Sequence, residues 1–192
     1  MQFTGTLLSA FAFAVDKHRY QRRKDRRLSP YVNHLVDVAN VLWNVGKVRD
    51  EDILIASILH DTLEDTNTKP EEILEQFGPV VLGYVEEVSD DKSKPKDVRK
   101  RIQILTASSK SQGAKQISLA DKIANLKDLA ERPPANWPAE RRKAYAVWAQ
   151  EVSMGLQGAN PLLEAQLEEV IQLVMNKLDD RLTRMPQQAQ SI

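Results

Sequence analysis

The sequence predicts an all-α protein, a single helical bundle around one buried core. Apolar residues recur at the 3.6-residue spacing of amphipathic helices through most of the chain, and no segment shows a convincing strand pattern. At 192 residues with 42% hydrophobic content, the chain is long enough for one core and short for two. We therefore expect one domain over residues 1–183, followed by a flexible tail over residues 184–192.

The first two helices are predicted by apolar stripes on either side of a basic loop. The stripe from Leu7 to Val15 indicates the first helix, and the stripe from His34 to Leu42 indicates the second, which Gly46 ends. The loop at residues 19–27 holds six Lys and Arg side chains against one Asp. A solvated loop is the usual interpretation of such a run. A phosphate or a nucleobase nearby is the alternative, since guanidinium planes bind phosphate and stack on rings.

Residues 50–65 are predicted to form one helix, which ends in the dense polar sequence HDTLED. His60 lies four residues before Glu64, and Asp61 lies four residues before Asp65, so the four side chains share one broad face of a helix. Adjacent carboxylates on such a face repel one another. A bound cation is therefore favoured over a solvated acidic helix end, which would leave His60 unexplained.

Further helices follow, separated by glycine, proline and polar residues. In the segment that runs from residue 114 to residue 129, Asp121 stands among Leu, Ala and Ile, with Asn125 one turn along on the same face. A buried carboxylate without a partner costs several kcal/mol, in the range of roughly 2–7 for a buried polar group, so Asp121 also indicates a nearby cation. The remaining predicted helices cover residues 71–77, 79–88, from about 97, 141–156 and from about 161 to 178.

Composition excludes several classes of site. The chain holds 27 Lys and Arg against 27 Asp and Glu, so net charge gives no reason to expect a nucleic-acid or membrane partner. It has no cysteine, which excludes disulfides, thiolate metal sites and cysteine nucleophiles. The apolar runs are too short to span a bilayer, and residues 1–15 do not resemble a signal peptide. We therefore expect a cytoplasmic location.

Two histidines and two carboxylates from three predicted helices together suggest a metal site between helices. The four residues are His34, His60, Asp61 and Asp121. They offer nitrogen and oxygen but no sulfur, so manganese, iron(II), zinc and magnesium all remain open on these residues alone.

This arrangement of a separate His, an adjacent His-Asp pair and a distant Asp resembles the HD-domain phosphohydrolases. The likeness extends to RRKD at residues 22–25, PYVNH at 30–34, HDTLEDT at 60–66, DDK at 90–92 and LADK at 119–122. These segments resemble the hydrolase domain of RelA/SpoT proteins over roughly residues 3–175. The closest likeness is to the free-standing small alarmone hydrolases, including the metazoan SpoT homologues.

The resemblance implies a single HD-domain helical bundle that holds one Mn²⁺ on His34, His60, Asp61 and Asp121. It implies hydrolysis of (p)ppGpp, a small nucleotide, to GDP or GTP and pyrophosphate. Glu64 and Asp65 would position or deprotonate the attacking water, with Glu64 the first choice as general base. By the same likeness Arg23 and Lys24 would flank the base. The looser candidates around the ribose and phosphates are Lys92, Lys96, Arg101, Asn125 and Tyr145.

The sequence departs from the family pattern in two places. Leu35 stands where the family often has proline after the histidine, which affects only the entry to a helix. The loop after Asp25 reads Arg-Arg-Leu-Ser without a glycine. This difference could change which base is accepted, and whether a 2′ or a 3′ phosphate is accepted. Removal of the NADPH 2′-phosphate, another nucleotide phosphohydrolase activity and a non-catalytic nucleotide-binding module stay open as alternatives, as does the oligomeric state.

Overall fold

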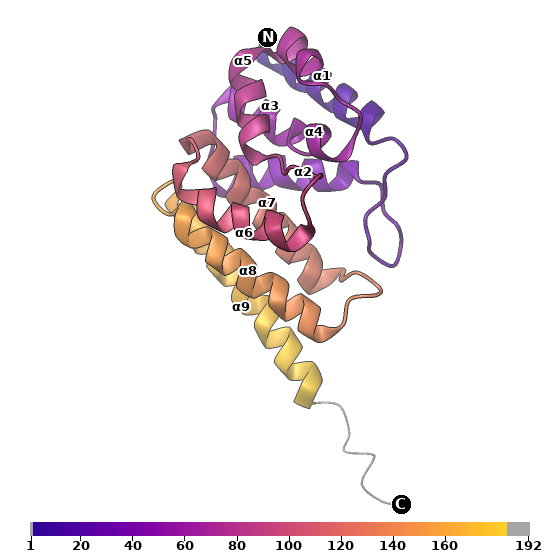
Figure 1. The fold of residues 1–192 in the computed structure, drawn as a ribbon, viewed down its shortest axis with the longest axis vertical. Coiled ribbons are helices and arrows are strands. Elements are labelled where there is room, and N and C mark those ends of the chain that lie inside the picture. The colour runs from indigo at the N-terminus through magenta and orange to yellow at the C-terminus, as the bar shows by residue number, and fades with distance from the viewer. Residues whose placement is uncertain (1, 184–192) are drawn as a thin grey trace, which may run out of the picture.

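The computed structural model describes residues 2–183, and each regular element in this part of the chain is a helix (Figure 1). The predicted all-α fold is confirmed. The predicted tail, residues 184–192, lies outside the described residues. The elements are α1 (Gln2–Lys17), α2 (Val32–Asn40), η1 (Val41–Val45), α3 (Glu51–Leu59), α4 (Thr62–Asp65), α5 (Pro70–Val88), α6 (Lys96–Thr106), η2 (Ala107–Ser109), α7 (Gln112–Glu131), α8 (Ala139–Leu156) and α9 (Pro161–Thr183).

Helix α7 is the centre of the bundle. It packs against α2, α3, α5, α8 and α9, and in Figure 1 it runs between the N-terminal helices above and α8 and α9 below. Its buried side chains cover more than one face, which is typical of a helix surrounded by others, and they include Ile117, Leu119, Ile123 and Leu126. The apolar side chains from α1 to α9 form one contiguous core around it.

The predicted helix over residues 50–65 is interrupted, which corrects the sequence interpretation. Helix α3 ends at Leu59 and α4 begins at Thr62, with a turn at His60 and Asp61 between them. The Thr62 hydroxyl donates to the Leu59 carbonyl at 2.6 Å, so a side-chain hydrogen bond satisfies a carbonyl at the C-terminal end of α3. The predicted N-cap is present, since Asp50 accepts from the Ile53 N–H at 3.1 Å.

Two other helical segments end or bend at glycine. In α5, Gly78 has a φ of 86°, so the segment consists of two helical parts on either side of it, as the sequence predicts. The second predicted helix becomes a π-helical turn, η1, before it ends at Gly46. None of the described helices is long and apolar enough to cross a membrane.

Candidate functional site

Four side chains from three parts of the sequence meet between α2, α7 and the turn after α3. His34 comes from α2, His60 and Asp61 from the turn, and Asp121 from α7. The His34 Nε2 lies 3.2 Å from Asp121 Oδ1 and 3.6 Å from Asp61 Oδ2. The His60 Nε2 lies 3.1 Å from Asp61 Oδ2 and 3.8 Å from Asp121 Oδ1. We call these four residues the His/Asp cluster.

The donor atoms of the His/Asp cluster are spaced as a divalent ion requires. One ligand atom each from His34, His60 and Asp121 lie within 4.8 Å of one another. Ligands at about 2.0–2.1 Å from an octahedral ion are themselves about 3 Å apart when adjacent. The distances from Asp61 to both histidines fall near the same value. The cluster therefore fits one small divalent ion.

Hydrogen bonding at His60 is also consistent with a metal ligand. Its Nδ1 lies 2.7 Å from the Ser57 carbonyl, so Nδ1 carries a proton, and in the neutral form that binds a metal the unprotonated Nε2 would face the carboxylates. The Nε2 atom is buried and has no hydrogen-bond partner of normal geometry among the described residues. A buried polar atom without a partner is costly, and an ion in the cluster would provide that partner.

The electrostatics of the cluster favour a positive charge. Burial on its own would raise the pKa of Asp61, but the positive charge of His60 lowers it below its ordinary value. Burial would likewise lower the pKa of His60, and the negative charges of Asp61 and Asp121 instead raise it to about 9. A cation between the two half-buried carboxylates therefore favours their ionised form, which is the role that a divalent ion would take.

Three neighbouring side chains fix the two carboxylates. The Tyr31 hydroxyl donates to Asp61 Oδ2 at 2.6 Å. The Asn125 amide donates to Asp121 Oδ1 at 2.5 Å, and Lys122 Nζ lies 3.0 Å from Asp121 Oδ2. Hydrogen bonds of this kind orient the ligands of a metal. Asn125, expected beside the substrate, therefore also contacts the cluster directly.

Glu64 shares a cavity with the His/Asp cluster. This cavity of about 120 Å³, the Lys110 cavity, is lined by Glu64, His60, Asp61, Asp121 and Lys110, with other residues of α5, α6 and α7. Burial raises the pKa of Glu64. Glu64 thus lies beside the cluster with a carboxylate whose proton affinity is increased.

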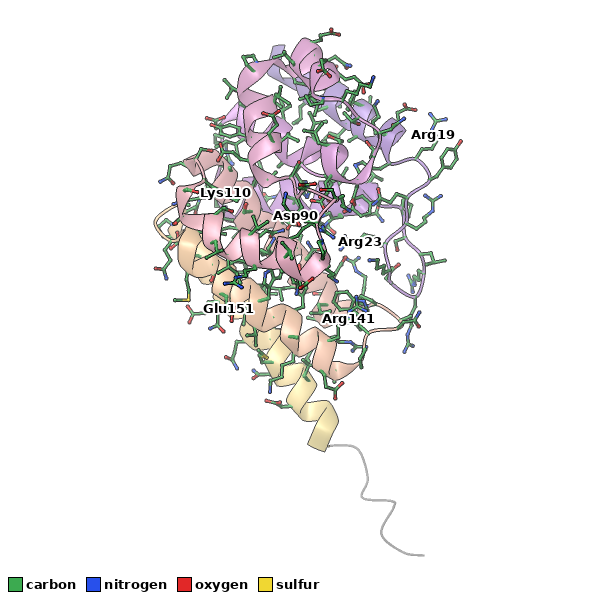
Figure 2. All side chains as sticks on the ribbon, in the orientation of Figure 1. Arg19, Arg23, Asp90, Lys110, Arg141 and Glu151 are labelled. Atoms are coloured by element: carbon green, nitrogen blue, oxygen red, sulfur yellow. The ribbon has the colours of Figure 1, made fainter. Side chains whose placement is uncertain are left out.

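Two further groups hold the Glu64 carboxylate in place. Its Oε2 accepts from the Asp90 N–H at 3.0 Å, and its Oε1 lies 3.2 Å from Arg99 Nη1. Figure 2 shows Asp90 near the middle of the molecule. The carboxylate is therefore fixed from α6 and from the loop before it.

Asp65 belongs to a different cavity. Its carboxylate accepts from the Gln21 amide at 2.9 Å and from Lys92 Nζ at 2.5 Å. It lines a cavity of about 240 Å³, the Arg23 cavity, to which Arg23, Lys24, Asn125 and Tyr145 also contribute. Glu64 and Asp65, which are adjacent on α4 and so point about 100° apart around its axis, thus line different cavities.

Within the Arg23 cavity, the guanidinium group of Arg23 is held in a fixed position. It donates to Asp128 Oδ2 at 2.7 Å and to Asn125 Oδ1 at 3.0 Å, and it lies 5.6 Å from the centre of the Tyr31 ring. The wall of the cavity also includes Trp137 and Tyr145, whose ring centres are 5.9 Å apart. A planar ligand would find guanidinium and aromatic surfaces here.

The basic residues predicted before and within α6 lie in several different places. Lys92 pairs with the carboxylates of Asp65 and Glu64, at 2.5 and 3.3 Å. Lys96 Nζ lies 5.6 Å from the centre of the Trp137 ring. Arg101 is exposed and lines none of the cavities described here.

Several residues around these cavities were not predicted from the sequence. Lys100 lies 4.5 Å from the Trp148 ring, and burial together with the neighbouring Lys96 lowers its pKa to about 8. Residues three and four apart lie on the same face of a helix. This spacing could have shown that one face of α6 carries Lys96, Arg99, Lys100 and Gln103. Arg99 and Lys100 belong to the basic segment that the sequence shows at residues 92–101, but their contacts were not predicted. The residues that were missed as site residues are Tyr31, Lys122, Asp128, Trp137 and Arg141.

Comparison with known proteins gives consistent matches over most of the chain. The family described as HD domain matches residues 10–150. A Xenopus tropicalis protein named guanosine-3′,5′-bis(diphosphate) 3′-pyrophosphohydrolase MESH1 is 48% identical over 164 residues, which cover 85% of this chain and 92% of that protein. The human protein of the same name is 46% identical over 164 residues, which cover 85% and 92% of the two chains.

A solved structure of a metazoan SpoT orthologue, described as a protein that hydrolyses ppGpp and plays a role in starvation responses, agrees with these sequence matches. It superimposes with a TM-score of 0.85 at 45% sequence identity, and the match covers 87% of this chain and 94% of that one. The fold, the His/Asp cluster and these matches agree, so the chain belongs to the HD-domain family, and within it to the group that contains the MESH1 proteins.

Proposed function

We propose that the protein is a Mn²⁺-dependent 3′-pyrophosphohydrolase that converts (p)ppGpp to GDP or GTP and pyrophosphate. The observation that carries the proposal is the His/Asp cluster, with Glu64 in the same cavity. The Arg23 cavity is close by, since Tyr31 lines that cavity and bonds to Asp61. The MESH1 relatives named for this reaction, at 46–48% identity, support it.

His34, His60, Asp61 and Asp121 would hold the ion. Their donors are imidazole nitrogen and carboxylate oxygen without sulfur, which suits manganese among other divalent ions. When bound, such an ion lowers the pKa of a water molecule and neutralises charge on phosphoryl oxygens. Tyr31, Lys122 and Asn125 keep the two carboxylates oriented toward the histidines.

Glu64 would accept the proton of the attacking water. The water oxygen bonds to the phosphorus attached to O3′ as its proton passes to Glu64, the P–O3′ bond breaks, and O3′ takes a proton from solvent and leaves as a hydroxyl. Glu64 is suited to this role because it is half-buried beside the cluster and has a raised pKa. The contacts from the Asp90 N–H and Arg99 hold its carboxylate in place during the step.

The Arg23 cavity would bind the guanosine part of the substrate. Arg23 and Lys24 flank the base, while Asn125 and Tyr145 contact the ribose and phosphates from α7 and α8. Asp65 and Lys92 form an ion pair between this cavity and Glu64, and we assign them to positioning rather than to proton transfer. Lys96 would contribute charge for the phosphates from the first turn of α6. Arg101 could act on the substrate only from the exposed side of that helix.

A substrate panel tests the proposal. The Mn²⁺-loaded protein is assayed with ppGpp, pppGpp, NADPH and dNTPs, and the products are separated by ion-exchange chromatography. We expect ppGpp and pppGpp to give the highest kcat/KM, with GDP or GTP and pyrophosphate as products. A higher kcat/KM for NADPH or a dNTP would replace the proposed substrate, and no turnover of any compound would refute catalysis.

A further inference from the structure

A second and larger cavity adjoins the Arg23 cavity and shares part of its lining. It has a volume of about 510 Å³, and we call it the Arg26 cavity. One wall is the loop at residues 25–29, and the other is the connector at residues 131–135 together with Arg142. Four arginines line it, namely Arg26, Arg27, Arg132 and Arg142, against two carboxylates, Asp25 and Glu131.

One hydrogen bond joins the two walls of this cavity, and another closes the loop that forms one of them. The Ala135 N–H donates to the Lys24 carbonyl at 3.2 Å, which joins the connector to the loop. The loop itself is closed by the Arg23 N–H, which donates to the Ser29 carbonyl at 2.8 Å. The cavity is therefore formed before any ligand binds, which reduces the entropy that a ligand must lose on binding.

The carboxylate of Asp25 already accepts hydrogen bonds within the loop. Both of its oxygens accept from Ser29, one from the N–H at 2.9 Å and one from the hydroxyl at 2.7 Å. These two hydrogen bonds lower the pKa of Asp25. Glu131 is thus the other acidic side chain in the wall, and it is exposed to solvent.

Arg26 and Arg27 differ from the other two arginines. Both are exposed, and neither forms a hydrogen bond or an ion pair within residues 2–183. Arg132, in contrast, donates to Asp128 Oδ1 at 2.7 Å, and Arg142 donates to the Trp137 carbonyl at 2.9 Å. Two fixed guanidinium groups and two that are open to a ligand thus surround one preformed space.

We propose that the Arg26 cavity binds a condensed phosphate, meaning a diphosphate or triphosphate chain, either free or carried on a nucleotide. Guanidinium groups bind phosphate oxygens in pairs, so several arginines around one cavity match a chain with several charged oxygens. The volume lies within the range of about 300–1,000 Å³ that is typical of small-molecule sites. The apolar part of the wall is two prolines and an alanine without an aromatic ring, so the phosphates rather than a base would be recognised.

The position of the site suggests a role distinct from the proposed reaction. Asp25, Arg132 and Pro134 line both the Arg26 and the Arg23 cavities, whereas none of the His/Asp cluster lines the Arg26 cavity. Asp128 accepts from Arg132 and from Arg23. A ligand that draws Arg132 away from Asp128 would therefore change the hydrogen bonding of Asp128, which also holds Arg23. The site does not depend on the proposed function, because its residues are separate from the cluster.

Binding of inorganic triphosphate to the metal-free full-length chain tests the proposal. The chain is dialysed against EDTA, its helical content is checked by circular dichroism, and the affinity is measured by isothermal titration calorimetry. We expect Arg26→Ala/Arg27→Ala to weaken binding by at least about tenfold, since hydrogen bonds to charged groups are among the stronger ones in proteins. Arg19→Ala is the matched control, because Arg19 is exposed and pairs with Asp16 outside the cavity.

Three outcomes would overturn the proposal: no binding of triphosphate at millimolar concentration, equal affinity in the double variant and the wild type, or an equal loss in Arg19→Ala. Arg26→Lys/Arg27→Lys separates charge from geometry, and we expect it to restore part of the affinity. A parallel titration with GTP identifies the source of the phosphate chain. An equal loss for triphosphate and GTP indicates recognition of the chain itself, and a larger loss for GTP indicates a nucleotide ligand.

Discussion

Replacing Glu64 by glutamine removes the proposed proton acceptor while it changes little else in the site. Glutamine has nearly the same shape and keeps an oxygen that can accept from the Asp90 N–H. The substitution loses the ion pairs with Arg99 and Lys92, at 3.2 and 3.3 Å. Arg99 keeps a second partner, Asp90, also at 3.2 Å. The fold and the His/Asp cluster should therefore persist.

The expected effect on turnover is large compared with the expected effect on stability. Loss of general-base catalysis typically lowers the rate by about 10²–10⁴-fold, which corresponds to about 2.7–5.4 kcal/mol in the activation free energy. The lost ion pairs are partly exposed, and such pairs contribute on the order of 0–1 kcal/mol to stability. Steady-state kinetics with ppGpp, thermal melting and elemental analysis on the same preparation measure turnover, stability and metal content.

Asp65→Asn is the matched control for this experiment. Asp65 carries the same charge one residue along, but it lines the Arg23 cavity and pairs with Gln21 and Lys92. We expect its turnover to fall less than that of Glu64→Gln. If Glu64→Gln kept full turnover, or if Asp65→Asn alone abolished it, the assignment of the base to Glu64 would be wrong.

Three other predictions follow from the same structure. Asp121→Asn and His60→Ala should each reduce the metal content well below one ion per chain by elemental analysis, and unchanged content in both would place the metal elsewhere. Arg23→Ala/Lys24→Ala should mainly raise KM for ppGpp; a normal KM with low turnover would instead favour the basic residues of α6. Because Ser29 lowers the pKa of Asp25, Asp25 stabilises the fold above its unfolded pKa of about 3.9, and this contribution is lost as the pH falls further. The gap in Tm between wild type and Asp25→Asn should therefore be full at pH 7 and close toward pH 3, and a gap that does not change with pH would refute it.

The helices and the residues of the His/Asp cluster could be predicted because their signals are local or strongly patterned. A stripe of apolar residues identifies a helix wherever it packs, and Asp121 among apolar neighbours indicates a charge partner without specifying its source. His60 and Asp61 are adjacent in the sequence, so they could be identified as candidate site residues without knowledge of the fold. The structure then brings both into one group with Asp121 and His34.

The direction in which the neighbouring acidic residues face could not be predicted. A continuous helix over residues 50–65 would place Glu64 and Asp65 on one broad face. In the structure the two side chains diverge around α4, so Glu64 lines the Lys110 cavity and Asp65 lines the Arg23 cavity. Nothing in the local sequence indicates that the Thr62 hydroxyl takes up the Leu59 carbonyl at the end of α3.

Partners far apart in the sequence were also beyond sequence-based prediction. Arg23 pairs with Asp128, which is 105 residues away, and Tyr31 bonds to Asp61 across 30 residues. In α6, successive residues turn by about 100° around the helix axis, so the exposure of Arg101 depends on which face packs against α8. Only the assembled bundle determines that face.

The proposed reaction is most directly tested by the products that the Mn²⁺-loaded protein forms from ppGpp, followed by ³¹P nuclear magnetic resonance. We predict that pyrophosphate and GDP appear in equal amounts and that EDTA stops the reaction. We also predict no detectable turnover for Asp121→Asn under the same conditions. Release of orthophosphate in place of pyrophosphate, or turnover that survives both EDTA and Asp121→Asn, would contradict a metal-dependent 3′-pyrophosphohydrolase.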